Sequence, residues 1–207
     1  MAFLNLLRDE RLVAVLRGDD PAKVRRAAET LIDSGIGIIE LTLTVPGAFE
    51  IVRDLSDAPA SVGIGTITAP EHVDQAVSAG AAFLVSPGIS QPLLEAMRES
   101  GMPALPGVQT PSEVMQARTA GFDLLKLFHA GQVGAGYISA VRGPFPELEF
   151  VPSGGISDAN AAEWLDAGAV AVGLGSLARP HEIAAEDWSG IREHARAALR
   201  AAGRSDA

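Results

Sequence analysis

Short apolar segments recur along this chain at a nearly constant interval, and amphipathic segments separate them. Many of the apolar segments, such as VAVL and IIELTL, are continuous hydrophobic runs, which is typical of parallel strands buried on both faces. Eight candidate strands start about 20 to 26 residues apart, at residues 12–16, 37–42, 61–66, 82–85, 103–106, 123–128, 148–153 and 169–174. Eight strand–helix units in a chain of 207 residues predict one α/β domain over residues 1–207, a (β/α)8 TIM barrel.

Proline and glycine mark the ends of the amphipathic segments. Several begin with a proline near the first turn and end just before a glycine, an asymmetry that is typical of α-helices. We therefore expect helices at residues 21–34, 70–79, 92–100, 111–120, 158–167 and 188–200. The main alternative is a doubly wound open sheet, which usually has fewer strands and a glycine-rich turn after its first strand. At that point this chain has Arg17-Gly18-Asp19-Asp20.

The charge and the residue types limit the partners of the chain. A formal net charge of −10 argues against nucleic acid, because binding to a phosphate backbone needs clustered cations. The sequence has no cysteine, so disulfides and thiolate metal sites are excluded. The four histidines show no metal-ligand spacing with one another or with carboxylates. We therefore expect neither a metal nor another cofactor.

The hydrophobic segments are too short for a membrane protein. The first residues, MAFLNLLRDE, lack the apolar run of a signal peptide. No segment approaches the roughly 20 apolar residues that a membrane-spanning helix needs. A cytoplasmic protein without a membrane partner is therefore expected.

Lys126 is the most unusual residue of the predicted strands, because it lies in the apolar run LLKLF. The chain holds only two lysines against fourteen arginines, and an ammonium group in an apolar strand is costly unless it is paired or neutral. Burial favours the neutral amine, which is the form that attacks a ketone. We therefore interpret Lys126 as a nucleophile. The alternative is a structural ion pair with Glu40.

Glu40 is a second isolated charge in an apolar strand, within IIELTL. Alternation along the strand places Ile38, Glu40 and Thr42 on one face. A carboxylate near a nucleophilic lysine can move protons during the addition to a ketone and the later steps. We interpret Glu40 as a general acid and base, with a role as counter-ion of Lys126 as the alternative.

Two further residues end predicted strands. Arg17 closes VAVLRG at the parity of Val13 and Val15, where a guanidinium can clamp a carboxylate. Thr66 closes GIGT, in which glycines allow a ligand to approach and the hydroxyl can donate to a substrate oxygen. Taken alone, Arg17 is also compatible with a surface salt bridge, and Thr66 with an ordinary turn.

Glycine-rich turns follow the last two predicted strands. The first contains Ser153, Gly154 and Gly155, and the second contains Gly175 and Ser176. Barrels often bind phosphate at these two positions through backbone N–H groups. The two turns together predict a phosphate site.

The chain as a whole resembles a known family, the class I 2-keto-3-deoxy-6-phosphogluconate (KDPG) and 4-hydroxy-2-oxoglutarate (KHG) aldolases. The resemblance extends in order over residues 10–180 and rests on the segments VAVLRG, IELTLTVPGA, GIGTIT, LVSPGIS, LPGVQTPSE, LLKLF, RGPFPELEFVPSGGI and AVGLGS. It implies a Schiff base on Lys126, a general acid and base at Glu40 and contact of Thr66 with the pyruvyl part of the substrate. It also implies a phosphate site at the two glycine turns and a homotrimer.

The chain departs from the family pattern at two positions. Many members carry an arginine after the glutamate strand that holds the substrate carboxylate. Thr44 stands there in this chain, so the resemblance assigns that task to Arg17, with Thr44 as a further substrate contact. After the lysine, the family usually has K-x-F-P and an acidic residue soon after. This chain has His129-Ala130-Gly131-Gln132 instead, which bears on substrate preference.

The leading hypothesis is a lyase that cleaves KDPG to pyruvate and glyceraldehyde 3-phosphate. A second hypothesis keeps this chemistry but takes 2-keto-3-deoxy-6-phosphogalactonate or 4-hydroxy-2-oxoglutarate. A third is a phosphosugar isomerase or synthase without a Schiff base, which leaves Lys126 without a chemical task. A fourth is a catalytically weakened barrel that binds sugar acids, motivated by the altered segment at residues 129–132.

Overall fold

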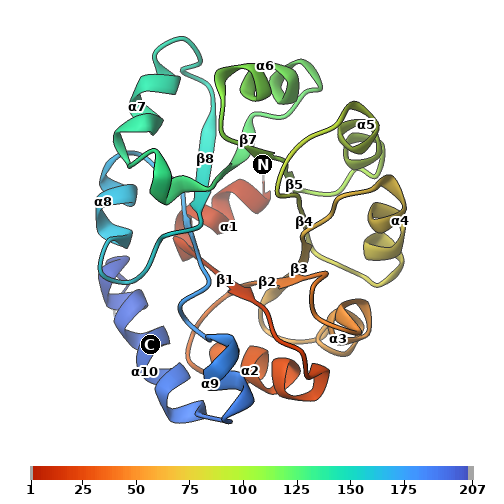
Figure 1. Ribbon diagram of the computed structural model, residues 1–207, viewed down its shortest axis with the longest axis vertical. Helices are drawn as coiled ribbons and strands as arrows, with labels where there is room; N and C mark the ends of the chain where they lie inside the picture. The colour runs from red at the N-terminus through yellow and green to blue at the C-terminus, as the bar shows by residue number, and fades with distance from the viewer. Residues whose placement is uncertain (1, 205–207) are drawn as a thin grey trace.

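Parallel strands form a ring, and helices surround it (Figure 1). The computed structural model describes residues 2–204, so the ends of the domain predicted over residues 1–207 lie outside the described residues. Nine strands hydrogen-bond in the order β5-β4-β3-β2-β1-β9-β8-β7-β6. Their bounds are β1 Leu12–Leu16, β2 Ile38–Thr42, β3 Ser61–Gly65, β4 Leu84–Val85, β5 Ala104–Leu105, β6 Gly107–Val108, β7 Leu124–Phe128, β8 Glu149–Ser153 and β9 Val172–Leu174.

The short strand β5 lies within the fifth predicted strand, residues 103–106, whereas β6 lies just beyond its predicted end, and Pro106 separates the two. Proline has no N–H to donate to a neighbouring strand. β5 pairs with β4, whereas β6 pairs with β7, and the carbonyl of Pro106 accepts a hydrogen bond from the N–H of Lys126 at 3.0 Å. The sheet therefore closes through this strand. The (β/α)8 TIM barrel is confirmed, and the open doubly wound sheet was the wrong alternative.

Helices follow the strands at the expected places. They are α1 Ala2–Glu10, α2 Pro21–Asp33, α3 Ala48–Asp54, α4 Pro70–Ser78, α5 Gln91–Glu99, α6 Pro111–Thr119, α7 Gly136–Arg142, α8 Ala161–Asp166, α9 Pro180–Ala184 and α10 Trp188–Ala201, with a 3-10 turn, η1, at Ala130–Gln132. Each of the six expected helices exists, although α8 begins later than predicted. The helices α1, α3, α7 and α9 are not among the segments expected from the sequence.

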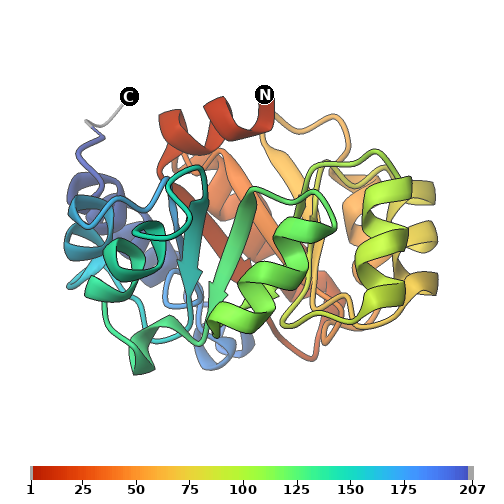
Figure 2. The ribbon, with the colours of Figure 1, turned by 90° about the horizontal axis from the view of Figure 1, so that it is seen from above.

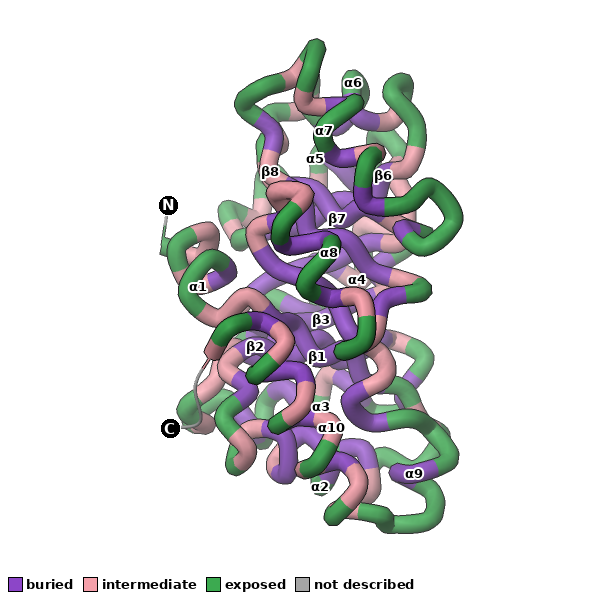
Figure 3. Tube along the Cα trace, turned by 90° about the vertical axis from the view of Figure 1, so that its left-hand side faces the viewer, coloured by how far each residue is buried: buried purple, intermediate pink, exposed green. Residues whose placement is uncertain are grey.

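The barrel has two hydrophobic layers. Residues that point outward from the strands, such as Ile39 and Leu41 of β2, pack against the helices in the larger core cluster. Residues that point inward, such as Val13 and Ile38, form a smaller cluster inside the ring. The buried parts of the chain follow the strands, and the exposed parts follow the outer faces of the helices (Figure 3).

Helix α1 closes one end of the barrel. Leu7 is fully buried in the interior cluster, and the ring of Phe3 stacks on that of Phe83 with centroids 4.9 Å apart. In Figure 2, α1 (red) lies at the end from which the arrows of β7 (green) and β8 (teal) point away. The C-terminal ends of the strands therefore remain for a site at the opposite end.

Within residues 2–204, no helix is both long enough and apolar enough to cross a membrane.

Candidate active site

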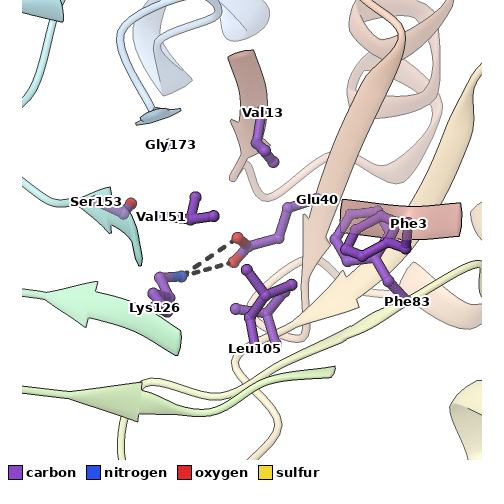
Figure 4. A pocket seen from close by; sticks show the side chains of 10 residues that line it. Phe3, Val13, Glu40, Phe83, Leu105, Lys126, Val151, Ser153 and Gly173 are labelled. Carbon is purple, nitrogen blue, oxygen red and sulfur yellow. Dashed lines mark hydrogen bonds and ion pairs between the residues drawn. The ribbon is translucent and has the colours of Figure 1, made fainter. Parts of the chain in front are cut away.

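Lys126 and Glu40 face each other across the inside of the barrel (Figure 4). The Nζ atom of Lys126 lies 3.1 Å from Oε1 and 3.2 Å from Oε2 of Glu40. The two residues come from β7 and β2, which lie on opposite sides of the ring. Their side chains are only 5% and 4% exposed. The structure therefore brings together the two isolated charges that the sequence singled out.

Glycines in the neighbouring strand β3 make room inside the ring for this pair. A Cβ atom built on Gly65 of β3 would lie 2.1 Å from Oε1 of Glu40, which is shorter than any tolerable contact. Gly63 of the same strand likewise makes room inside the ring, because a Cβ atom there would lie 2.6 Å from the ring of Phe83. Because glycine has no side chain, the Glu40 carboxylate can extend past β3 toward Lys126 inside a ring that otherwise holds apolar groups.

The surroundings of the pair are almost entirely apolar. Val13, Val85, Leu105 and Val151 line the same internal space, with the hydroxyl of Ser153 as a polar group at its border. The ring of Phe128 lies 5.4 Å from Lys126 Nζ. Few polar groups therefore compete for the amine, and Glu40 is positioned to accept a proton from it. This arrangement can deliver a neutral lysine to a carbonyl group at the open end of the barrel.

The two glycine turns lie next to each other. Ser153 at the end of β8 is in register with Gly173 of β9, so the turns that follow these strands are neighbours. Gly154 and Gly155 have φ values of 89° and 82°, a left-handed conformation that favours glycine. Such turns direct successive backbone N–H groups toward one side, where an anion can be held.

The second turn has two features of a polar binding site. The hydroxyl oxygen of Ser176 is buried and has no hydrogen-bond partner among the described residues. Arg17 is exposed at the end of β1, and a Cβ atom on Gly175 would lie 3.4 Å from its Nη1 atom. The guanidinium therefore borders this turn. A buried hydroxyl without a partner is costly, and a ligand that accepts its proton would remove that cost.

Three threonines lie at the ends of β2 and β3. Thr42 donates its hydroxyl proton to the carbonyl of Leu16 at 2.9 Å, and its oxygen lies 2.7 Å from that of Thr44. Since the Thr42 proton is already used, Thr44 is the donor in the second bond. Thr66 directly follows β3 with φ of 63°, an unusual value for a β-branched residue. Residues held in such conformations are often found at functional sites.

Sequence reasoning did not assign Thr42, Gln109 or Tyr137 to the site. Thr42 anchors Thr44, and the alternation along its strand was the available signal. Gln109 follows β6. Its side-chain amide donates to the backbone carbonyl of His129 at 3.3 Å, and its backbone carbonyl accepts a hydrogen bond from the hydroxyl of Tyr137. Burial raises the pKa of Tyr137, and the nearby Glu113 carboxylate adds to this effect. These contacts connect distant segments, so no local pattern in the sequence marks them.

Comparisons with known proteins each match aldolases. A family model described as KDPG and KHG aldolase matches residues 4–194. A 2-dehydro-3-deoxy-phosphogluconate aldolase from Pseudoalteromonas atlantica is 35% identical over 179 residues, which cover 84% of this chain and 83% of the relative. The 2-dehydro-3-deoxy-6-phosphogalactonate aldolase of Escherichia coli is 32% identical over 169 residues, which cover 80% and 82%.

A solved structure shows the same architecture. The KDPG aldolase of Legionella pneumophila superposes with a TM-score of 0.87 at 30% sequence identity, covering 93% of this chain and 95% of the other. In that structure, pyruvate was captured at low pH as a covalent carbinolamine intermediate.

Proposed function

The chain belongs to the KDPG and KHG aldolase family, and we propose that it cleaves KDPG to pyruvate and glyceraldehyde 3-phosphate through a Schiff base on Lys126. Its relatives are named aldolases, which are lyases. The observation that carries the proposal is the buried contact of Lys126 Nζ with both carboxylate oxygens of Glu40. Lys126 pairs in register with Val151, two residues before Ser153, at which the first glycine turn begins. The carbinolamine captured in the Legionella relative supports the same chemistry.

The proposed reaction begins with proton transfer from Lys126 to Glu40. The neutral amine adds to the C2 ketone, and the resulting carbinolamine loses water after Glu40 returns a proton to its hydroxyl group. The protonated imine then accepts the electron pair of the C3–C4 bond while a base removes the proton of the C4 hydroxyl. Glyceraldehyde 3-phosphate leaves, C3 of the remaining enamine gains a proton, and hydrolysis of the imine releases pyruvate and restores Lys126.

The substrate ends are assigned to the residues around the mouth of the barrel. We propose that Arg17 and Thr66 hold the carboxylate end, with Thr44 as a further contact. The phosphate is assigned to the neighbouring turns that contain Ser153, Gly154, Gly155, Gly175 and Ser176. The buried Ser176 hydroxyl, which has no hydrogen-bond partner among the described residues, supports an anion at this turn.

The same chemistry on 2-keto-3-deoxy-6-phosphogalactonate or 4-hydroxy-2-oxoglutarate is the second candidate. It is favoured by nearly equal similarity to relatives named for the gluconate and galactonate substrates, at 35% and 32% identity.

We also propose a cytoplasmic homotrimer, in line with the resemblance to the family. Sedimentation equilibrium would measure the number of subunits.

Borohydride reduction in the presence of pyruvate tests the mechanism. We expect the mass of a reduced pyruvyl group on Lys126 and no such adduct in Lys126→Arg. The second lysine of the chain offers a matched control, because Lys23 on α2 pairs with Glu186 on the surface and Lys23→Arg should be modified like the wild type. An unmodified Lys126 would exclude the Schiff base. Initial rates with the three keto acids would then identify the preferred substrate.

A further inference from the structure

His129 is an exposed side chain at the mouth of the barrel that the proposed mechanism does not use. It directly follows β7 and stands three positions after Lys126. Because the C-terminal ends of the strands carry the site in a TIM barrel, a side chain at this position can reach a bound substrate. Phe128 lies beside it, with ring centroids 5.5 Å apart in an edge-on arrangement.

The backbone around His129 is held from two sides. Its carbonyl accepts hydrogen bonds from the Gln109 amide at 3.3 Å and from the N–H of Gln132 at 3.1 Å. The N–H of Gly131 donates to the carbonyl of Gly154 at 2.8 Å. The segment is therefore tied to the end of β6 and to the turn after β8, so His129 has a defined position relative to that turn.

The imidazole itself lies against the first glycine turn. A Cβ atom built on Gly154 would lie 3.2 Å from Cδ2 of His129, and one built on Gly131 would lie 3.0 Å from Cα of Gly155. The glycines allow this close approach. Within residues 2–204, neither ring nitrogen of His129 takes part in a hydrogen bond or an ion pair. The ring is thus fixed next to the turn while its polar atoms stay available.

We infer that His129 is a specificity-determining residue that donates a hydrogen bond to the phosphate of the substrate held at the Gly154–Gly155 turn. The inference rests on the proposed function. In a chain with a formal net charge of −10, an anion site needs donors that carry no negative charge, and an imidazole N–H is such a donor in either protonation state. A donor placed at the distal end of the substrate distinguishes phosphorylated from unphosphorylated keto acids.

Kinetics of His129→Ala and His129→Gln test this inference. The two substrates are KDPG and its unphosphorylated analogue, 2-keto-3-deoxygluconate. Loss of a hydrogen bond to a charged group should raise the KM for KDPG in His129→Ala by about 10-fold or more. The KM for the analogue and the borohydride trapping of pyruvate should stay within about twofold of the wild type, since neither involves the phosphate. His129→Gln keeps a neutral donor and should raise the KM less.

Gln132→Ala is the matched control, because Gln132 is exposed in the same segment and its side chain makes no hydrogen bond among the described residues. It should leave both KM values unchanged. An equal rise of KM for both substrates in His129→Ala would indicate a merely structural effect and overturn the inference, as would an unchanged KM for KDPG.

A direct binding measurement separates this inference from the proposed function. If wild-type protein gave no pyruvate adduct, the proposed function would fail, and titration with inorganic phosphate would still decide the task of His129. We expect His129→Ala to weaken phosphate binding relative to both the wild type and Gln132→Ala. Equal affinity in all three proteins would overturn the inference.

Discussion

At the scale of single residues, Lys126 and Glu40 are two charged side chains that are buried inside the barrel because they pair with each other. A buried pair gains attraction but loses hydration, so it is weak evidence for a purely stabilising role. Lys126 Nζ lies within hydrogen-bond distance of both carboxylate oxygens, so a proton can pass directly from one group to the other. Chemistry therefore accounts for the pair better than stability does.

Gly65→Ala should disturb the pair without altering either partner. The added methyl group would lie 2.1 Å from Glu40 Oε1, so the carboxylate must move away from Lys126. A displacement of about 1 Å of a catalytic group can cost on the order of 100-fold in rate, and we expect a fall in kcat of that order. Initial rates with KDPG would measure it.

Gly136→Ala is the control for this substitution, because a Cβ atom at that position, in α7, meets nothing within 4 Å. It should keep wild-type kcat. Wild-type activity of Gly65→Ala would show that the position of the Glu40 carboxylate is not critical.

At the scale of elements, the start of α6 supports the segments around the site. The carboxylate of Glu113 accepts hydrogen bonds from the N–H groups of Gln109 and Thr110 and from the hydroxyl of Thr110. The Thr110 hydroxyl oxygen in turn accepts from the N–H of Glu113, which completes a capping box. Gln109 in turn contacts His129 and Tyr137. The cap of one helix therefore orients a residue that holds the segment after β7.

The stability conferred by Glu113 should depend on pH. Burial raises the pKa of Glu113, but the hydrogen bonds from Gln109 and Thr110 lower it by more, so the net pKa lies below its ordinary value of about 4.3. The stabilisation is therefore complete above the ordinary pKa and is lost as the pH falls through the folded-state pKa. Glu113→Gln should lower the free energy of unfolding by about 1 kcal/mol at pH 7 and by progressively less below pH 4, as measured by urea denaturation.

The comparison for this pH dependence is Glu71→Gln. Glu71 lies exposed in the first turn of α4 and makes no side-chain hydrogen bond within the described part of the chain. Its substitution should change stability by only a few tenths of a kcal/mol. A difference between Glu113→Gln and the wild type that stays constant from pH 7 to strongly acid pH would contradict the assignment.

At the scale of the whole molecule, the two ends of the barrel have separate tasks. Helix α1 covers the N-terminal ends of the strands, with Leu7 inside the interior cluster. The threonines and the glycine turns lie at the other end, and the charged pair lies between the two ends, in the middle of β2 and β7. This division predicts that stability and activity respond to different substitutions.

Leu7→Ala should destabilise the protein while leaving catalysis intact. Leu7 is 0% exposed, and removal of such a side chain costs about 2–5 kcal/mol in the free energy of unfolding. Thermal or urea unfolding would measure the loss, and kcat/KM determined well below the unfolding transition should match the wild type. Asn5→Ala, at an exposed position of α1, should change neither quantity. A large fall in kcat/KM for Leu7→Ala would show that the two ends are coupled.

The sequence by itself determined the features that depend on neighbouring residues. Apolar runs, the alternation within them and the proline and glycine at helix ends are local, and they were sufficient to predict the barrel and the inward direction of Glu40 and Lys126. The glycine turns were recognised for the same reason. The family resemblance then supplied their chemical meaning.

Only the tertiary structure decided which distant residues meet. The contact of Lys126 with Glu40 joins residues 86 positions apart, and it exists because the ring closes through the strand interrupted at Pro106. The position of the Arg17 guanidinium beside Gly175 depends on the pairing of β1 with β9, two strands far apart in the sequence. Helix α1 is held over the interior by the packing of Leu7 in the inner cluster. Such contacts follow from the radius of the barrel and the stagger of its strands, which no short segment of sequence encodes.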